Sequence, residues 1–444
     1  MRHIVIVGFE SAGLTAASTA RMVDRKAKIT VIERRPYAIS HPCGIPFAIG
    51  GEVADIQKLI EPAPRLPNVE VRTATEATAI DTKKQTIEIS DLKVGKREEL
   101  KYDALVLATG SYAFKPPIPG IDLKNVYVVK TVEDGQAIIN ALSKAKNAIV
   151  VGAGTIGIEA AAALQKRGLN VSLVEMLPSI LPGMLDPDMA DSVAEHLRDK
   201  GIHIFRGQSL KEIRGQEQVS SVVMEEQKLP AEIVIVAVGV KPEVRLAKVA
   251  GVELGKTGGI KVNEHLRTNA PNVYAAGDCT ESFCLITKRP VLSQLATTAI
   301  RMGKVAGANA AGGDAVYSGT FNTVVTCAYG LEIASTGVTT YAARQAGFAP
   351  VSARVRTLSK PHYYPSAEPI IVKLLVEPRE HKLIGGQVLG TEGAAERANL
   401  LALAIQKGMT AEELARIEYC YAPPVCDCME PLVVAAEALL RKLK

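Results

Sequence analysis

Residues 148–157 read AIVVGAGTIG, and this stretch decides the fold class. A short apolar run predicts a buried strand, and the glycines after it have the G-x-G-x-x-G spacing of a dinucleotide-binding turn. The first glycine permits a tight turn, the second lets backbone approach a pyrophosphate, and the following helix offers free N–H groups. An Ala-rich stretch and a second apolar run ending at Glu175 follow. The pattern predicts a strand–helix–strand unit that binds a dinucleotide at Gly152, Gly154 and Gly157.

Glu175 indicates which dinucleotide this unit binds. A carboxylate at this position can bond both ribose hydroxyls and would repel a 2′-phosphate. Met176 and Leu177 follow it and offer no arginine to receive such a phosphate. We therefore expect NADH, with NADPH less favoured. The alternative is an ordinary turn at the start of a helix.

A second unit of this kind lies at the N-terminus, about 144 residues earlier, where the apolar run 2–7 leads into Gly8-Phe9-Glu10-Ser11-Ala12-Gly13. Glu10 stands where the second glycine is expected, so the motif is weak when taken alone. Glu33 strengthens it, because it ends the next apolar run 20 residues after Gly13, where an acid can bind a ribose. Two such units predict an α/β fold with two doubly wound, Rossmann-like nucleotide-binding domains.

Other segments indicate how the chain is divided. Residues 105–110 predict a buried strand that ends at a glycine, and a stiff Pro-rich connection at 115–120 marks a crossing between domains. A second crossing lies at 239–242. From about residue 321, strands followed by helical stretches predict an α+β third domain. The expected domains are residues 1–114 with 242–320, residues 115–241, and residues 321–444.

The apolar run 273–276 leads into Gly277 and Asp278. The carboxyl ends of the strands form the edge at which α/β sheets bind ligands, and a glycine allows close backbone approach. A simple turn would also explain this pair. Beside two nucleotide units, it indicates a further contact to the ribityl chain or phosphate of a flavin.

Composition narrows the class of partner. The chain has 444 residues, 47% hydrophobic and 22% charged, and its net charge of +5 is scattered without a basic block. We therefore expect no nucleic-acid or membrane partner. The apolar stretch at residues 4–9 is too short for a signal peptide, which favours the cytoplasm. Seven cysteines, an odd number, without a C-x-x-C pair predict reduced thiols and no metal site.

These pieces, in this order, resemble the pyridine nucleotide-disulfide oxidoreductases over nearly the whole chain. Within that superfamily, three segments resemble the branch with one redox cysteine, which holds coenzyme A disulfide reductases, persulfide reductases and NADH oxidases. They are residues 42–47 (PCGIPF), 362–365 (HYYP) and 421–424 (YAPP). The resemblance implies FAD at the first unit, NADH at the second, and a homodimer joined through the third domain.

The resemblance also implies which residues contact the cofactors. They are Gly8, Glu10, Ser11, Ala12, Gly13, Glu33, Arg34, Cys43, Ala108, Thr109, Gly110, Gly152, Gly154, Thr155, Ile156, Gly157, Glu159, Glu175, Gly239, Gly277, Asp278 and Ala296. Glu159 matches a glutamate that lies near nicotinamide and flavin in relatives, although a helix-surface charge is the alternative. Thr155 stands where relatives usually have a tyrosine that covers the flavin, so the flavin face is expected to be more open.

Cys43 is the expected redox centre. Two-cysteine members use C-x₄-C, but Ala48 occupies the second position, so Cys43 must cycle as thiolate, mixed disulfide, persulfide or sulfenate. Pro46 suits the first turn of a helix, so we expect Cys43 at a helix N-terminus, where the dipole lowers its pKa. The alternative is a small buried cysteine that only packs.

Three tyrosines complete the expected catalytic group. Tyr363, Tyr364 and Tyr421 resemble tyrosines that reach the cysteine from the partner subunit, where a phenol can hydrogen-bond or protonate a leaving thiolate. Packing at the dimer interface is the alternative. Relatives that use coenzyme A carry a serine at the position of Ile39 and an arginine pair on the first helix, so strict coenzyme A specificity is not expected.

The expected enzyme uses FAD and NADH to reduce a small-molecule sulfur substrate at Cys43. The candidates are a persulfide, a polysulfide or a disulfide, with coenzyme A derivatives among them. The alternatives are an NADH oxidase that cycles through a sulfenic acid, a flavin-bearing redox sensor without turnover, and a reductase of a small carrier protein. Cys426 and Cys428 are unexplained by the resemblance. They are either packing residues or an auxiliary thiol pair that exchanges with Cys43.

Overall fold

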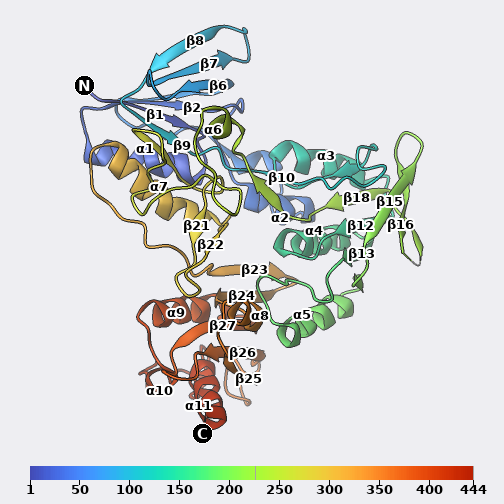
Figure 1. Cartoon of the computed structure of the whole chain (residues 1–444). Coiled ribbons are helices and arrows are strands. Elements are labelled where there is room, and N and C mark those ends of the chain that lie inside the picture. The colour runs from blue at the N-terminus through green and yellow to red at the C-terminus, as the bar shows by residue number, and fades with distance from the viewer. Residues whose placement is uncertain (226, 444) are drawn as a thin grey trace.

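The computed structural model describes residues 1–225 and 227–443 and has three lobes (Figure 1). The first lobe contains a parallel sheet in the order β20-β9-β1-β2-β5. Its strands are β1 (His3–Val7), β2 (Lys28–Ile32), β5 (Val69–Arg72), β9 (Ala104–Leu107) and β20 (Val273–Ala275). Helices α1 (Ser11–Val23) and α7 (Ala296–Ala310) pack on one face, and the antiparallel strands β6 (Thr75–Asp81), β7 (Thr86–Asp91) and β8 (Arg97–Lys101) lie on the other.

Both faces of this sheet are covered, which explains its nearly continuous apolar strands. Ile4 and Ile6 of β1 pack toward α1 and α7, whereas Val5 and Val7 pack toward β7. The two helices touch closely because α7 carries glycines, and a Cβ at Gly303 would stand 2.4 Å from a carbonyl oxygen of α1.

The second lobe repeats this plan with a parallel sheet in the order β11-β18-β12-β13-β14. Its strands are β11 (Val126–Tyr127), β12 (Asn147–Val151), β13 (Asn170–Glu175), β14 (His203–Arg206) and β18 (Ile233–Val236). Helices α2 (Ile45–Gly50), α3 (Val132–Leu142), α4 (Thr155–Lys166) and α5 (Pro187–Asp199) share its core on one face, and the antiparallel strands β15 (Leu210–Gly215), β16 (Val219–Met224) and β17 (Lys228–Pro230) cover the other.

Short elements connect the lobes. Strands β10 (Ser111–Ala113) and β19 (Val240–Pro242) pair antiparallel, so the chain enters and leaves the second lobe through one ribbon. The remaining short elements are β3 (Ile39–Ser40), β4 (Ile60–Glu61), α6 (Arg245–Val249), β21 (Ser282–Phe283), β22 (Pro290–Val291) and the 3₁₀ helices η1 (Pro42–Gly44) and η2 (Ile56–Leu59). The domain boundaries expected from the sequence stay predictions.

The third lobe is an antiparallel sheet in the order β23-β24-β27-β26-β25, packed against helices. Its elements are β23 (Val324–Ala328), β24 (Leu331–Gly337), α8 (Thr340–Gln345), β25 (Val351–Leu358), β26 (Pro369–Val376), β27 (Leu383–Gly390), α9 (Ala394–Gln406), α10 (Ala411–Leu414) and α11 (Pro431–Leu443). The predicted α/β class, with two Rossmann-like sheets and an α+β third unit, is confirmed. No helix in the described ranges is long and apolar enough to cross a membrane.

A buried ion pair joins the second and third lobes. Asp186, 1% exposed at the start of α5, lies 2.9 Å from the Nζ atom of Lys373 on β26. Its carboxylate also accepts hydrogen bonds from the backbone N–H and the hydroxyl of Thr340, at 2.8 and 2.7 Å. The side-chain oxygen of Gln387 accepts the N–H of Asp186 at 2.8 Å. These contacts fix the base of α5 against the antiparallel sheet.

Candidate active site and cofactor sites

The two glycine turns have the same geometry. In the first, Gly8 donates its N–H to the carbonyl of Ile32 at 2.8 Å, and in the second Gly152 donates to Val174 at 2.8 Å. Both glycines have positive φ, +95° and +98°, which a side chain disfavours. In each turn a Cβ on the third glycine would stand 1.9 Å from the carbonyl oxygen of the first. The glycines are therefore required by the turns themselves.

The two acids also have matching roles. Glu33 accepts the N–H of Phe9 at 2.9 Å, and Glu175 accepts the N–H of Ala153 at 2.8 Å. Both acids are buried at the ends of their strands. Each carboxylate is thus held at the edge of the turn, where a ribose would lie.

The helix N-termini behind the turns fit a pyrophosphate. Neither α1 nor α4 has a side chain that caps its first N–H groups. At Gly154, the second glycine of the second turn, an added Cβ would have no heavy atom within 4 Å. Free donors, a positive dipole end and open space together suit FAD at one turn and a nicotinamide dinucleotide at the other. The first-turn residues are Ser11, Ala12 and Gly13 in α1, and Thr155, Ile156 and Gly157 in α4.

Glu10, which makes the first motif irregular, is held in place. Its carboxylate forms an ion pair with Arg35 and accepts the hydroxyl of Ser40 at 2.6 Å. Arg35 also bonds Glu33 at 2.9 Å. Arg34, the predicted contact, is exposed and forms no ion pair with a described residue. The sequence motif alone did not reveal that Arg35, its neighbour, organises this turn.

Asp278 lies at the carboxyl edge of the first sheet, as predicted. It accepts the hydroxyl of Ser111 at 2.7 Å, and Lys130 donates to the same hydroxyl at 2.9 Å. The Lys130 Nζ atom lies 3.8 Å from the carboxylate. Sequence reasoning missed Lys130 and Ser111, since neither belongs to a recognisable motif.

The structure also places the remaining predicted cofactor contacts. Gly277 has φ +85°, and a Cβ there would stand 2.9 Å from the Cβ of Ala12, which places the first helix beside β20. Thr109 donates its hydroxyl to the carbonyl of Glu243 at 2.6 Å. The remaining positions are Ala108 and Gly110 after β9, Gly239 before β19, and Ala296 at the start of α7.

Cys43 lies in η1, directly before α2, and its side chain is exposed. Partial burial of the thiol by the surrounding elements raises its pKa, and the Glu159 carboxylate raises it further, whereas Lys130 lowers it. The predicted position before a helix is confirmed, but the predicted decrease in the pKa is wrong. Burial, the largest cause, and the nearby Glu159 carboxylate raise the pKa of this thiol by more than Lys130 lowers it.

Glu159 connects the second lobe to the third. It lies on α4, and the hydroxyl of Thr326 on β23 donates to its Oε1 atom at 2.5 Å. Burial raises the pKa of Glu159, and the Thr326 hydrogen bond opposes that rise. Because it is partly buried and bonds a strand of the third lobe, Glu159 is not a simple helix-surface charge, and its contact with nicotinamide and flavin stays a prediction.

The predicted tyrosines gather on the third lobe. The hydroxyls of Tyr363 and Tyr421 lie 3.3 Å apart, although the two residues are 58 positions apart in the chain. This hydrogen bond raises the pKa of Tyr421 to about 12. Tyr364 donates its backbone N–H to Pro361 at 2.8 Å and closes the preceding turn. No hydrogen bond between described residues of this chain joins these tyrosines to Cys43.

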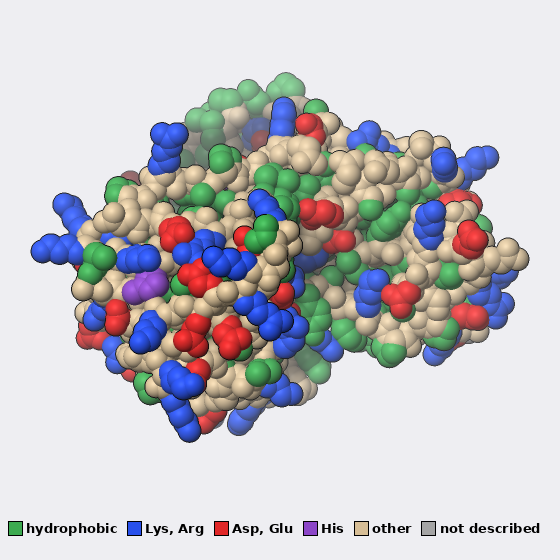
Figure 2. Space-filling model, turned by 90° about the horizontal axis from the view of Figure 1, so that it is seen from above, with side chains coloured by type: hydrophobic (Ala, Val, Ile, Leu, Met, Phe, Trp, Pro, Cys, Tyr) green, Lys and Arg blue, Asp and Glu red, His purple; other side chains and the backbone are tan. Residues whose placement is uncertain are grey.

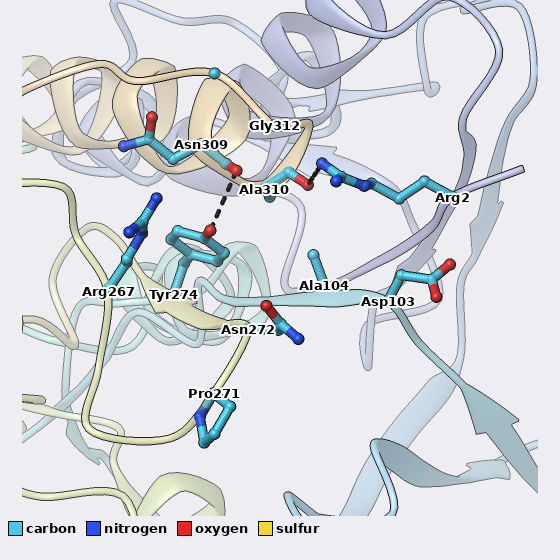
Figure 3. A pocket seen from close by; sticks show the side chains of 11 residues that line it. Arg2, Asp103, Ala104, Arg267, Pro271, Asn272, Tyr274, Asn309, Ala310 and Gly312 are labelled. Atoms are coloured by element: carbon cyan, nitrogen blue, oxygen red, sulfur yellow. Dashed lines mark hydrogen bonds between the residues drawn. The ribbon is translucent and has the colours of Figure 1, made fainter.

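A cavity of about 400 Å³ lies at the opposite end of the first sheet (Figure 3). Two of its charged groups are engaged, since Arg2 donates to the carbonyl of Ala310 at the end of α7 and Asp103 accepts the N–H of His3, whereas the third, Arg267, is exposed. Tyr274 donates to the carbonyl of Asn309 at 3.1 Å. This cavity lies at the C-terminal end of α7 and is remote from the glycine turns.

Comparison with known proteins identifies the family. Residues 2–303 match the model of the pyridine nucleotide-disulphide oxidoreductases, and residues 323–431 match the dimerisation domain of that family. The chain belongs to the pyridine nucleotide-disulphide oxidoreductases. The chain is 41% identical over 445 residues to an NADH oxidase of Methanocaldococcus jannaschii, and the match covers 99% of each chain.

Two further oxidoreductases of this family are informative. The CoA-dependent NAD(P)H sulfur oxidoreductase of Pyrococcus furiosus is 33% identical over 99% of each chain. The structure of a NAD-dependent persulfide reductase from A. fulgidus superposes with a TM-score of 0.95 at 37% identity, over 99% of this chain and 83% of that one. The present oxidoreductase is thus an enzyme that uses FAD and NAD(P)H, and it carries the dimerisation domain of its family.

Proposed function

We propose that this oxidoreductase is a homodimer that uses NADH to reduce low-molecular-weight persulfides, polysulfides or disulfides through Cys43. The observation that carries the proposal is the position of an exposed, unpaired thiol within electrostatic reach of both nucleotide turns, since Glu10, Asp278 and Glu159 all act on it. The names of the P. furiosus and A. fulgidus relatives support a sulfur substrate. Seven free cysteines support a cytoplasmic enzyme.

The chain supplies residues for each part of the sulfur chemistry. FAD, when bound, supplies a two-electron carrier between nicotinamide and sulfur. Lys130 stabilises the Cys43 thiolate, which attacks the outer sulfur of a persulfide and releases a thiolate. We place the Tyr363–Tyr421 pair of one protomer at Cys43 of the partner subunit, where a phenol can donate a proton to that leaving thiolate. Glu10, Glu33, Glu159 and Glu175 hold and orient the two nucleotides.

Parallel stopped-flow reactions test this function. The NADH-reduced enzyme is mixed with cysteine persulfide, with coenzyme A disulfide and with dioxygen, and flavin absorbance is followed. We expect reoxidation by persulfide to be at least about tenfold faster than by dioxygen, because Cys43 is a sulfur nucleophile. Dioxygen as the fastest oxidant would instead identify an NADH oxidase, the second candidate, which the M. jannaschii relative favours. No reoxidation by any of the three would indicate a sensor or a carrier-protein reductase.

The coenzyme preference follows from Glu175. We expect NADH to bleach the flavin at least about tenfold faster than NADPH at equal, subsaturating concentration, because like charges placed together cost several kcal/mol. Glu175 accepts both the Ala153 and the Leu177 N–H groups, so the test variant must keep an acceptor there. Glu175→Gln with Met176→Arg removes the anion and adds a cation at an exposed position, and should reverse the preference. Glu175→Gln with Met176→Gln is the control, and equal rates for both coenzymes in wild type would refute the assignment.

A further inference from the structure

The C-terminal cysteine loop, residues 419–429, is folded back on itself. The N–H of Cys426 donates to the carbonyl of Ala422 at 2.9 Å, and its thiol donates to the carbonyl of Cys420 at 3.3 Å. The hydroxyl of Tyr419 donates to the carbonyl of Cys428 at 3.2 Å. These three bonds bring Cys428 back beside the start of the loop, where Tyr421 lies.

The thiols in this loop differ in their surroundings. Cys426 is buried and its hydrogen bond is satisfied within the loop. Cys428 is exposed, and its carbonyl is bonded to Tyr419, two residues before Tyr421. After the Tyr363 hydrogen bond, Cys428 and Asp427 also raise the pKa of Tyr421. Since Tyr421 also bonds Tyr363, the two phenols and the Cys428 thiol form one cluster at the surface of the third lobe.

The surface around this cluster is apolar and uncovered in the single chain. Tyr363, Tyr421, Val425 and Met429 are 62%, 48%, 68% and 49% exposed. Large apolar side chains grouped in this way mark an interaction surface. The C-terminal cysteine loop lies within residues 323–431, the segment that matches the dimerisation domain. The occupant that fits this surface is therefore a second copy of this chain.

We propose that Cys428 of one protomer is the second redox thiol for Cys43 of the partner subunit. This proposal rests on the proposed function, because it uses the placement of the Tyr363–Tyr421 pair at that cysteine. It assigns different roles to two cysteines that lie only two residues apart. Cys428 takes part in the sulfur chemistry, and Cys426 stabilises the fold of the loop.

The resulting reaction is balanced. The Cys43 thiolate attacks the outer sulfur of R–S–SH, which forms a Cys43 persulfide and releases RS⁻. The Cys428 thiolate then attacks the Cys43 sulfur of that persulfide, forms a Cys43–Cys428 disulfide between subunits and releases HS⁻. Two electrons from NADH, with protons from the medium, return the disulfide to two thiols. The net change is NADH + H⁺ + RSSH → NAD⁺ + RSH + H₂S.

Asp427 sets the ionisation of the second thiol. A hydrogen bond with the Asp427 carboxylate raises the pKa of Cys428. Asp427→Asn removes this effect and is expected to speed formation of the intersubunit disulfide at pH 7.

The test traps that disulfide without turnover. The FAD-loaded enzyme, without NADH, receives one equivalent of cysteine persulfide per subunit, is quenched with N-ethylmaleimide and is run on a non-reducing gel. We expect a cross-linked dimer in wild type and in Cys426→Ser, and its loss in Cys428→Ser and in Cys43→Ser. Mass spectrometry should find a peptide pair that joins Cys43 to Cys428. Persulfide turnover should fall at least about tenfold in Cys428→Ser and stay unchanged in Cys426→Ser.

Failure of this proposal and failure of the proposed function give different results. If wild type turns over persulfide, forms no cross-linked dimer and loses nothing in Cys428→Ser, the second thiol is refuted and the function stands. A cross-link through Cys420 or Cys426 also refutes the assignment. If persulfide neither reoxidises the NADH-reduced enzyme nor cross-links the dimer, both proposals fall together.

Discussion

Cys43→Ser is expected to lose persulfide turnover by at least about a thousandfold while NADH still bleaches the bound flavin at a rate within about twofold of wild type. The reason is that the hydroxyl of serine is a poor sulfur nucleophile at neutral pH, whereas Gly152, Glu175 and the rest of the nicotinamide site lie on other elements. Two measurements separate these effects. Single-turnover bleaching by NADH reports the nucleotide sites, and sulfide release from cysteine persulfide reports Cys43.

Cys327→Ser is the matched control for this experiment. Cys327 lies on β23 and lines a cavity of about 200 Å³ together with Pro46, Phe47 and Glu159, so it is a nearby thiol in the same chain. Its replacement should change persulfide turnover by less than about twofold. Full turnover by Cys43→Ser would show that another group carries the sulfur chemistry, and a loss of bleaching would show that the substitution damages the nucleotide sites.

The second large effect separates two glycines of one turn. Gly154→Ala should leave stability nearly unchanged and weaken NADH binding at least about tenfold, because its methyl group would stand in open space where the pyrophosphate approaches. Gly157→Ala should instead destabilise the fold by about 3 kcal/mol, because its Cβ would stand 1.9 Å from the carbonyl oxygen of Gly152. Urea unfolding measures the stability of each variant, and titration of the flavin bleaching rate with NADH measures its NADH affinity.

Retained FAD is the internal control for both variants, since the first turn is untouched by either substitution. Normal NADH affinity in Gly154→Ala would show that the dinucleotide does not approach this turn. Wild-type stability in Gly157→Ala would mean that the turn relaxes without cost and that the third glycine is dispensable for the fold.

The features that the sequence predicted well are local. A glycine turn, its strand, its helix and the acid that closes the next strand all lie within about 30 residues, so their spacing carries the geometry. The structure accordingly has Glu33 and Glu175 in matching positions. The apolar run that begins at residue 148 and the run that ends at Glu175 are strands β12 and β13.

The features that could not be predicted depend on contacts between distant segments. Lys130, which acts on the Cys43 thiol, precedes α3 without any motif, and Thr326 reaches Glu159 across 167 positions. The pKa of Cys43 was mispredicted for the same reason. A sequence shows the helix that follows the cysteine but shows neither the burial of the thiol nor the acid that the fold places near it.

Figure 2 shows charges of both signs interspersed over one face of the molecule. Because exposed ion pairs contribute little to stability, the charged groups that hold the lobes together are the buried ones. The Asp186–Lys373 pair is the clearest of these. Separating the two lobes would break this ion pair and the hydrogen bonds that Thr340 donates to Asp186. We therefore expect the nicotinamide unit and the antiparallel sheet to unfold as one cooperative unit, so that an opening of one lobe disrupts the other.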